Sequence, residues 1–157
     1  MKNFYSLAVI YLILALSCNN KNELFSEFTG DAKHIFRQVT INDSPEEVKI
    51  KESSSALIIE EDYTLIYHYK YKQANTKIQY AFDDQGLYKI EATAECRSEK
   101  TTKELWQKLS RHYTQKYGSA EINENTATWL INDDTAILEL RQLSNKSDII
   151  LTFEALE

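Results

Sequence analysis

Glycine and proline are scarce in this sequence, with three glycines and one proline among 157 residues. So low a content argues against a linker-rich or disordered chain, because such chains are enriched in both residues. It also leaves little room for a glycine-rich phosphate loop or a nucleophile elbow, and neither motif is present. Hydrophobic residues make up 43% and charged residues 27%, which is the composition of one globular domain of ordinary size.

Basic residues are also in short supply, because 18 lysines and arginines face 24 acidic residues and give a formal net charge of -6. A nucleic-acid partner is not expected, since binding requires a basic surface that neutralises phosphates. Bulk attraction to anionic lipid is disfavoured for the same reason.

Residues that could carry chemistry are few and scattered along the chain. The histidines fall in three separate predicted elements and lack the spacing of a metal site; they are His34, His68 and His112. Neighbouring carboxylates occur four times, at residues 46–47, 60–62, 83–84 and 133–134. Most of these belong to a helix start or to turns, not to a dyad converging in a cleft. We therefore expect no catalytic residue, no metal and no cofactor.

The N-terminal apolar run is too short to span a membrane. It extends from Phe4 to Leu16, interrupted only by Ser6, whereas a bilayer span needs about 20 residues. Lys2 precedes it, and the small residue Ser17 and then Cys18 follow it. A basic start, a short apolar region and a small residue before the cleavage point predict an export signal over residues 1–17.

The end of this run, Leu14-Ala15-Leu16-Ser17-Cys18, resembles the lipobox of bacterial lipoproteins. With the Asn-rich continuation, it is similar to small lipoproteins of Bacteroidota-type bacteria. The resemblance implies that Cys18 carries a diacylglycerol and an amide-linked acyl chain such as palmitate, which together give a stable membrane anchor. The protein would then be extracytoplasmic, at the periplasmic face or the cell surface. An ordinary cleaved signal or an uncleaved anchor helix stays open as an alternative.

After the anchor, the sequence predicts a lipidated cysteine and polar tether over residues 18–33 and a single domain over residues 34–157. If Cys18 is acylated, Cys96 is the one remaining cysteine and cannot form an intramolecular disulfide. We expect Cys96 to be a buried, unreactive core residue.

The first half of this domain begins with a short helix and continues as strands. Ser44 as N-cap, Pro45 at the first helical position and Glu47 in a capping box predict a helix from Pro45 to Ile50. Alternating polarity then predicts four strands, at Ala56–Glu61, Tyr63–Lys72, Thr76–Asp83 and Leu87–Cys96.

The alternation assigns one buried and one exposed face to these strands, as in an antiparallel sheet. The expected buried face carries Leu65, Tyr67, Tyr69, Tyr71, Ile78, Tyr80, Phe82, Tyr88, Ile90, Ala92, Ala94 and Cys96. The expected exposed face carries a basic group composed of His68, Lys70, Lys72, Lys77 and Lys89.

The second half repeats the order of helix and strands. A single apolar stripe predicts a helix over residues 99–117, stopped by Gly118. Three further strands are predicted at Thr126–Asn132, Thr135–Arg141 and Asp148–Glu154.

Together, these elements predict an α+β fold: an antiparallel sheet built from two helix-plus-meander units, with the helices packed on one face. The order resembles small envelope lipoprotein modules and the tandem helix–meander folds of β-lactamase inhibitory proteins. The segments at residues 36–39, 43–48 and 116–118, with Trp129, resemble a family of secreted bacterial α+β domains that has no assigned chemistry.

The functional hypothesis is a lipid-anchored, non-enzymatic module that binds another envelope component, expected to be a protein. The basic group at residues 68–89 is its candidate interaction face, although such lysines also serve to protect strand edges. The alternative is an envelope enzyme or a small-ligand carrier with a cleft between helix and sheet, lined by Tyr67, Tyr69, Tyr80 and Tyr88. Asp134-Thr135-Ala136 resembles an O-glycosylation motif of Bacteroidota-type bacteria, which would modify Thr135, or it simply begins a strand.

Overall fold

The computed structural model describes residues 23–31, 33–131, 135–143 and 147–156. The predicted signal peptide at residues 1–17 and the predicted anchor Cys18 lie outside these ranges.

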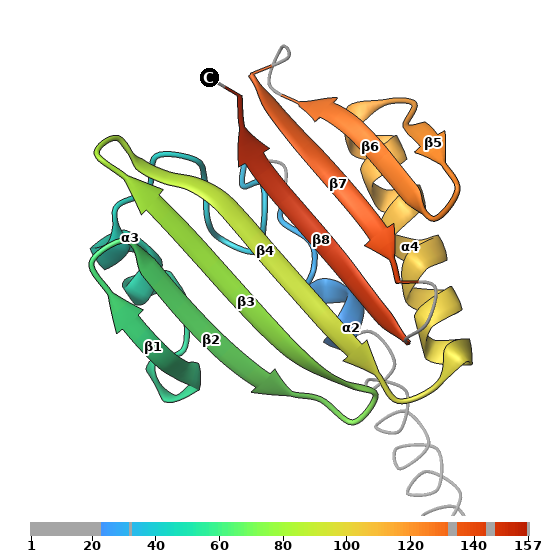
Figure 1. The fold of residues 1–157 in the computed structure, drawn as a ribbon, viewed down its shortest axis with the longest axis horizontal. Helices are drawn as coiled ribbons and strands as arrows, with labels where there is room; N and C mark the ends of the chain where they lie inside the picture. The colour runs from blue at the N-terminus through green and yellow to red at the C-terminus, as the bar shows by residue number, and fades with distance from the viewer. Residues whose placement is uncertain (1–22, 32, 132–134, 144–146, 157) are drawn as a thin grey trace, which may run out of the picture.

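The described residues form an α+β domain around one antiparallel sheet of eight strands (Figure 1). The strands are β1 (Leu57–Glu61), β2 (Thr64–Lys70), β3 (Ala74–Asp83), β4 (Gly86–Cys96), β5 (Glu121–Asn123), β6 (Thr126–Ile131), β7 (Ala136–Gln142) and β8 (Asp148–Ala155). They are arranged in the order β1-β2-β3-β4-β8-β7-β6-β5. Neighbouring strands in the sheet are consecutive in the chain, with one exception. Strands β4 and β8 are paired although they are far apart in sequence, and their pairing joins the two halves of the sheet.

Among the described residues, four helical segments accompany the sheet: α2 (Glu23–Ser26), α3 (Pro45–Lys51), the 3-10 turn η2 (Ser54–Ala56) and α4 (Glu99–Tyr117). In Figure 1, α2, α3 and α4 lie behind the sheet, and α4 carries the chain from the end of β4 to the far edge at β5. Within the described ranges, no helix is long and apolar enough to cross a membrane.

Local sequence signals determine where the two longer helices begin and end. The capping box predicted for α3 is present: Ser44 accepts a hydrogen bond from the Glu47 backbone, and the Glu47 side chain accepts one from the Ser44 backbone. Helix α4 covers the predicted residues and ends at Gly118, whose φ of 92° favours glycine.

The core lies between the sheet and the helices. Tyr113 of α4 is fully buried at its centre, with ring-centroid distances of 5.9 Å both to Trp129 of β6 and to Phe153 of β8. Its hydroxyl donates a hydrogen bond to the Phe28 carbonyl, which connects α4 to the N-terminal segment. Cys96 is buried, as predicted, at 8% exposure.

The prediction of a polar tether over residues 18–33 is wrong from residue 23 on, because the described residues there already belong to the folded domain, which was predicted to begin at residue 34. Leu24 and Phe28 are buried in the core, and α2 packs against α4. The physical reason is a small apolar set, Leu24, Phe25 and Phe28, inside an otherwise polar stretch. Burying these side chains stabilises the segment more than leaving them in water as a tether.

Two features of the sheet also differ from the prediction. The three-residue edge strand β5 was missed, because Glu121–Asn123 has no alternating apolar pattern. Tyr88 was predicted on the buried face, but Leu87 is buried in its place. The cause is an irregularity in the β3–β4 pairing between Ala81 and Phe82, which shifts the side-chain alternation by one residue.

Candidate interaction surface

The face of the sheet opposite the helices, here called the open face, carries the basic group that the sequence singled out. His68 lies directly opposite Lys77 on the neighbouring strand. Lys70 is two residues further along β2 and so is on the same face of the sheet. All three side chains are exposed. Lys72 is exposed in the connection between β2 and β3. The structure therefore brings these four side chains to one end of the open face.

Lys89 is not part of that cluster. It pairs in register with Ala81, four residues along β3 from Lys77, and its ammonium lies 2.9 Å from the Glu154 carboxylate. The hydrogen bond to Glu154 raises the pKa of Lys89. Its charge is thus already compensated, and the predicted basic face is divided in two.

The region around Lys89 is a broad groove in the open face, with a volume of about 1040 Å³. Its lining comes from the β3–β4 hairpin, β4, β8 and β7, with Asn42 and Tyr63 at the rim. Several of its lining residues belong to the β3–β4 hairpin and to the C-terminal end of β8, which Figure 1 draws at the same end of the sheet.

The groove is predominantly acidic. Its carboxylates are Asp83, Asp84, Glu91, Glu139 and Glu154, and its cations are Lys89 and Arg141. Both cations are associated with groove carboxylates, Lys89 with Glu154 at 2.9 Å and Arg141 with Glu139 at 3.9 Å. The groove consequently retains an excess of three negative charges.

The irregularity in the β3–β4 pairing gives the groove its aromatic residue. Because the alternation shifts at this point, Tyr88 and Lys89 are both half-buried and both line the groove, while Leu87 faces the core. Tyr63, 58% exposed, contributes a second ring from the β1–β2 turn.

The rim next to Tyr88 is fixed by backbone pairing with the loop before α3. Asn42 N donates to Leu87 O and Leu87 N donates to Asp43 O, each at 2.8 Å. Gly86 permits this close approach, because its φ is 115° and a Cβ there would lie 2.5 Å from the Asn42 carbonyl oxygen.

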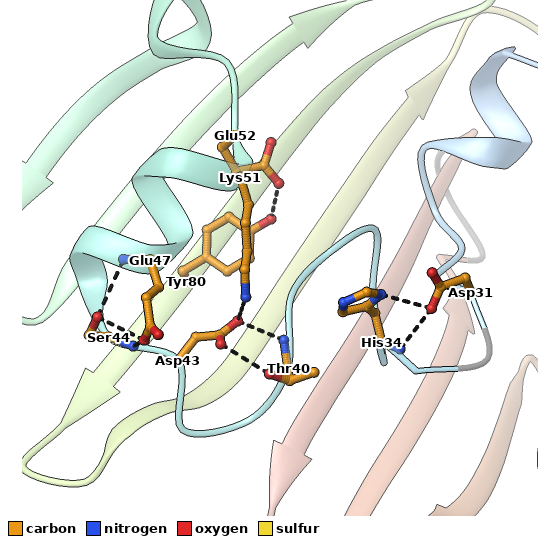
Figure 2. A network of polar contacts seen from close by, with 9 residues as sticks. All are labelled: Asp31, His34, Thr40, Asp43, Ser44, Glu47, Lys51, Glu52 and Tyr80. Carbon is orange, nitrogen blue, oxygen red and sulfur yellow. Dashed lines mark hydrogen bonds and ion pairs between the residues drawn. The ribbon is translucent and has the colours of Figure 1, made fainter.

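Asp43 holds that loop in place, as Figure 2 shows. Its carboxylate accepts hydrogen bonds from the Thr40 backbone at 2.8 Å, the Thr40 hydroxyl at 3.0 Å and Lys51 Nζ at 2.7 Å. Burial alone would raise the pKa of Asp43, but the hydrogen bonds from Lys51 and Thr40 leave that pKa below its ordinary value.

A second polar group lies on the buried side, around Glu52 at the end of α3. The Glu52 side chain is 1% exposed and lies 3.3 Å from Arg37, which also pairs with Glu27 at 3.1 Å. The Tyr69 hydroxyl donates to Glu52 at 2.6 Å, and the Tyr80 hydroxyl donates to its other oxygen (Figure 2 draws Tyr80 and Glu52). Burial and the neighbouring carboxylate raise the pKa of both tyrosines.

These contacts decide what the tyrosines can do. The hydroxyls of Tyr69 and Tyr80 are directed to Glu52, and Tyr88 is on the opposite face of the sheet. The four tyrosines named in the alternative prediction therefore do not line a common cleft. The Glu52 group connects α3 and the N-terminal segment to the sheet, and its charges are compensated internally.

The remaining sequence-predicted residues lie apart from one another. Thr135 is exposed immediately before β7, so its predicted O-glycosylation stays a prediction. His34 contacts Asp31 at 2.7 Å, and His112 is half-buried against the Phe25 ring. In the described part of the chain, no three His, Cys, Asp or Glu side chains gather as metal ligands would.

Sequence reasoning missed the groove because its side chains come from strands far apart in the chain. Glu91 and Glu139 both flank Thr152 in the register, although 48 residues separate them in sequence. A residue pattern along one strand carries no information on such pairing across strands.

Comparisons with known proteins give little further information. No protein-family model matches this chain. A search of curated proteins finds no match either. Among solved structures, the chain is similar to a DUF4309 family protein (YjgB) from Bacillus subtilis, with a TM-score of 0.44 and 10% identity over 88% of this chain and 94% of that chain. A similarity this low supports no functional argument.

Proposed function

We propose that this chain is a lipid-anchored protein of the bacterial cell envelope and that its domain is a non-enzymatic binding module acting through the open face of the sheet. The observation that carries the binding role is the contrast between the two faces. One face is covered by helices and fully packed, and the other is exposed and hollowed by a groove of about 1040 Å³.

The use of the polar side chains supports a binding role over catalysis. Asp43 holds a loop, Glu52 compensates Arg37, and Lys89 is paired with Glu154. Each of these groups thus has a structural partner in the fold. The partner we propose is another envelope protein, and no nucleic acid, since the chain is acidic.

The proposed anchor rests on the sequence features of residues 1–18. Residues 1–17 would be the export signal and Cys18 the lipidated residue, placing the domain outside the cytoplasm. Because the residues from Glu23 on already belong to the folded domain, at most a few residues would separate Cys18 from it. The domain would then lie close to its membrane.

We also propose that the sheet consists of two helix-plus-meander units, α3 with β1–β4 and α4 with β5–β8. Each unit has one helix followed by four consecutive strands, and the strand order is symmetric about the β4–β8 junction. This arrangement would give one continuous open face formed by both units.

The test of this function combines fractionation with crosslinking in the native organism. The wild-type protein should be found in the membrane fraction and incorporate a labelled fatty acid, and Cys18→Ser should lose both properties while staying folded. Photo-crosslinkers placed at Thr93 or Thr152 on the open face should yield a discrete protein adduct, whereas one at Gln107 on α4 should not. Membrane retention of Cys18→Ser would overturn the anchor, and equal adducts from all positions would overturn the binding face.

A further inference from the structure

We propose that the acidic groove on the open face is a docking site for a cationic segment of a partner protein, carrying at least two lysine or arginine side chains. This inference rests on the proposed binding function and specifies its partner. It is argued from the shape, the charge and the apolar content of the groove.

The groove is built into the fold and does not depend on a partner to form. The backbone of Leu87 is paired with residues 42 and 43 on one side, and Gly86 permits that contact. Its floor is the continuous ladder of β4, β8 and β7. A preformed concave surface of this kind lowers the entropic cost of binding.

Charge determines the type of segment that fits. Glu91, Asp83 and Asp84 form no ion pair with another described residue, whereas both groove cations do. A negatively charged partner would be repelled by the excess of three carboxylates. A positively charged segment would be attracted to the groove and would compensate that excess.

Spacing favours a segment with several charges over a single small cation. Glu91 and Glu139 are both aligned with Thr152, one on each neighbouring strand, so about two strand separations, roughly 10 Å, lie between their backbone positions. Among the described residues, no three His, Cys, Asp or Glu side chains gather closely enough to hold one compact metal ion. Two long basic side chains on one polypeptide can contact both Glu91 and Glu139.

The apolar surface of the groove favours lysine and arginine in particular. Tyr63 is 58% exposed and Leu156 is 43% exposed at the rim, and Tyr88 is half-buried beside Lys89. Aliphatic stems of basic side chains pack on such surface, and guanidinium groups stack over tyrosine rings. A groove in which carboxylates lie next to tyrosine rings can thus contact both the guanidinium group and the aliphatic stem of an arginine.

The experiment measures binding of synthetic peptides to the full-length protein in detergent micelles at 50 mM and 300 mM salt. The probes are a fluorescein-labelled decapeptide of alternating arginine and serine and a matched decapeptide of alternating glutamate and serine. We expect the arginine peptide to bind at least tenfold more tightly at 50 mM salt and to weaken at 300 mM salt. Equal affinity of the two peptides would overturn the proposal.

Matched charge variants locate the binding site. Asp84→Asn with Glu91→Gln should weaken binding of the arginine peptide at least fivefold. Glu99→Gln with Glu104→Gln, which removes the same charge from α4 behind the sheet, should change it less than twofold. Equal loss in both variants would show attraction by overall charge and overturn the proposal. So would complete competition by equimolar Mg²⁺, since one compact cation would then suffice.

This experiment is separable from the test of the proposed function. If the open-face crosslinkers capture a protein but the groove variant binds the arginine peptide as tightly as wild type, the cationic-segment proposal fails and the binding function stands. If crosslinking yields the same adducts from the α4 position as from the open face, the proposed function fails on its own evidence.

Discussion

Arg37 and Glu52 form an ion pair beneath the sheet, in which Arg37 Nη2 lies 3.3 Å from Glu52 Oε2 and the Glu52 side chain is 1% exposed. The guanidinium also lies 4.7 Å from the centre of the Tyr69 ring. Although burial alone would lower the pKa of Arg37, the carboxylates of Glu52 and Glu27 raise it. Two segments 15 residues apart in sequence are thus joined by an ion pair whose carboxylate is almost fully buried.

Removing only the arginine should therefore be costly. Arg37→Met leaves the Glu52 carboxylate buried without its cation, and breaking a buried pair in this way costs about 3–5 kcal/mol of unfolding free energy. Urea denaturation followed by circular dichroism measures the loss. The exposed pair of Lys103 with Glu99 provides the control, because Lys103→Ala should leave the unfolding midpoint unchanged.

A double variant separates the charge effect from lost packing. Arg37→Met with Glu52→Gln keeps a hydrogen-bond partner for each tyrosine hydroxyl, because the amide oxygen accepts from one and the amide NH2 donates to the other, and it leaves no charge at residue 52. It should recover most of the stability lost in Arg37→Met. If the two substitutions were simply additive, the ion pair would not be the source of the loss.

Gly86 and Gly118 offer a second comparison, because both have positive φ but differ in surroundings. A Cβ at Gly86 would lie 2.5 Å from the Asn42 carbonyl oxygen, whereas nothing lies within 4 Å of one at Gly118. Gly118→Ala should cost only the backbone strain, about 1–3 kcal/mol. Gly86→Ala should cost clearly more, since it also separates the loop from the hairpin. Equal thermal shifts in the two variants would contradict this explanation.

His112 should make stability depend on pH. Burial, and then the positive charge of Lys116, lower the pKa of His112 below 6.5, and its Nε2 is buried without a hydrogen-bond partner among the described residues. The unfolded chain therefore binds more protons than the folded chain just below pH 6.5. Stability should be fully present above this pH and should fall as the pH drops below it.

A pair of histidine variants isolates the part of this pH dependence that comes from His112. Chemical denaturation at pH 7.5, 6.5, 5.5 and 5.0 should show a steeper decline for wild type than for His112→Gln. His68→Gln, at an exposed position on the open face, is the matched control and should keep the wild-type slope. If His112→Gln kept the wild-type slope, His112 would not be the source of the pH dependence.

Much of the fold could be predicted because its signals are local. Ser44 and Glu47 define the start of α3 within four residues, and Gly118 ends α4 in the predicted place. Alternation located seven of the eight strands, although the exact ends shifted by one or two residues. Each of these signals depends only on neighbours in the sequence.

The groove could not be predicted because it depends on pairing across strands, and the Glu52 group could not be predicted because it depends on packing between an N-terminal loop and the sheet. One shift in the alternation, between Ala81 and Phe82, was enough to move Tyr88 to the open face. The partner of Lys89 is Glu154, 65 residues away in sequence. Glu52 likewise pairs with Arg37 only because the N-terminal segment packs under the sheet, which its mostly polar composition did not suggest.

Cys96 provides a test of the core that needs only a thiol reagent. It is 8% exposed at the end of β4, and burial raises the pKa of its thiol, so little reactive thiolate is present at pH 8. In the Cys18→Ser background, iodoacetamide should label Cys96 at least tenfold more slowly in buffer than in 8 M urea. Adding Ser55→Cys, which places a second thiol at an exposed position, should give one rapidly labelled cysteine per chain in buffer. Rapid labelling of Cys96 in the folded protein, at the rate of the Ser55→Cys thiol, would show that the end of β4 is open to solvent and that the described packing there is wrong.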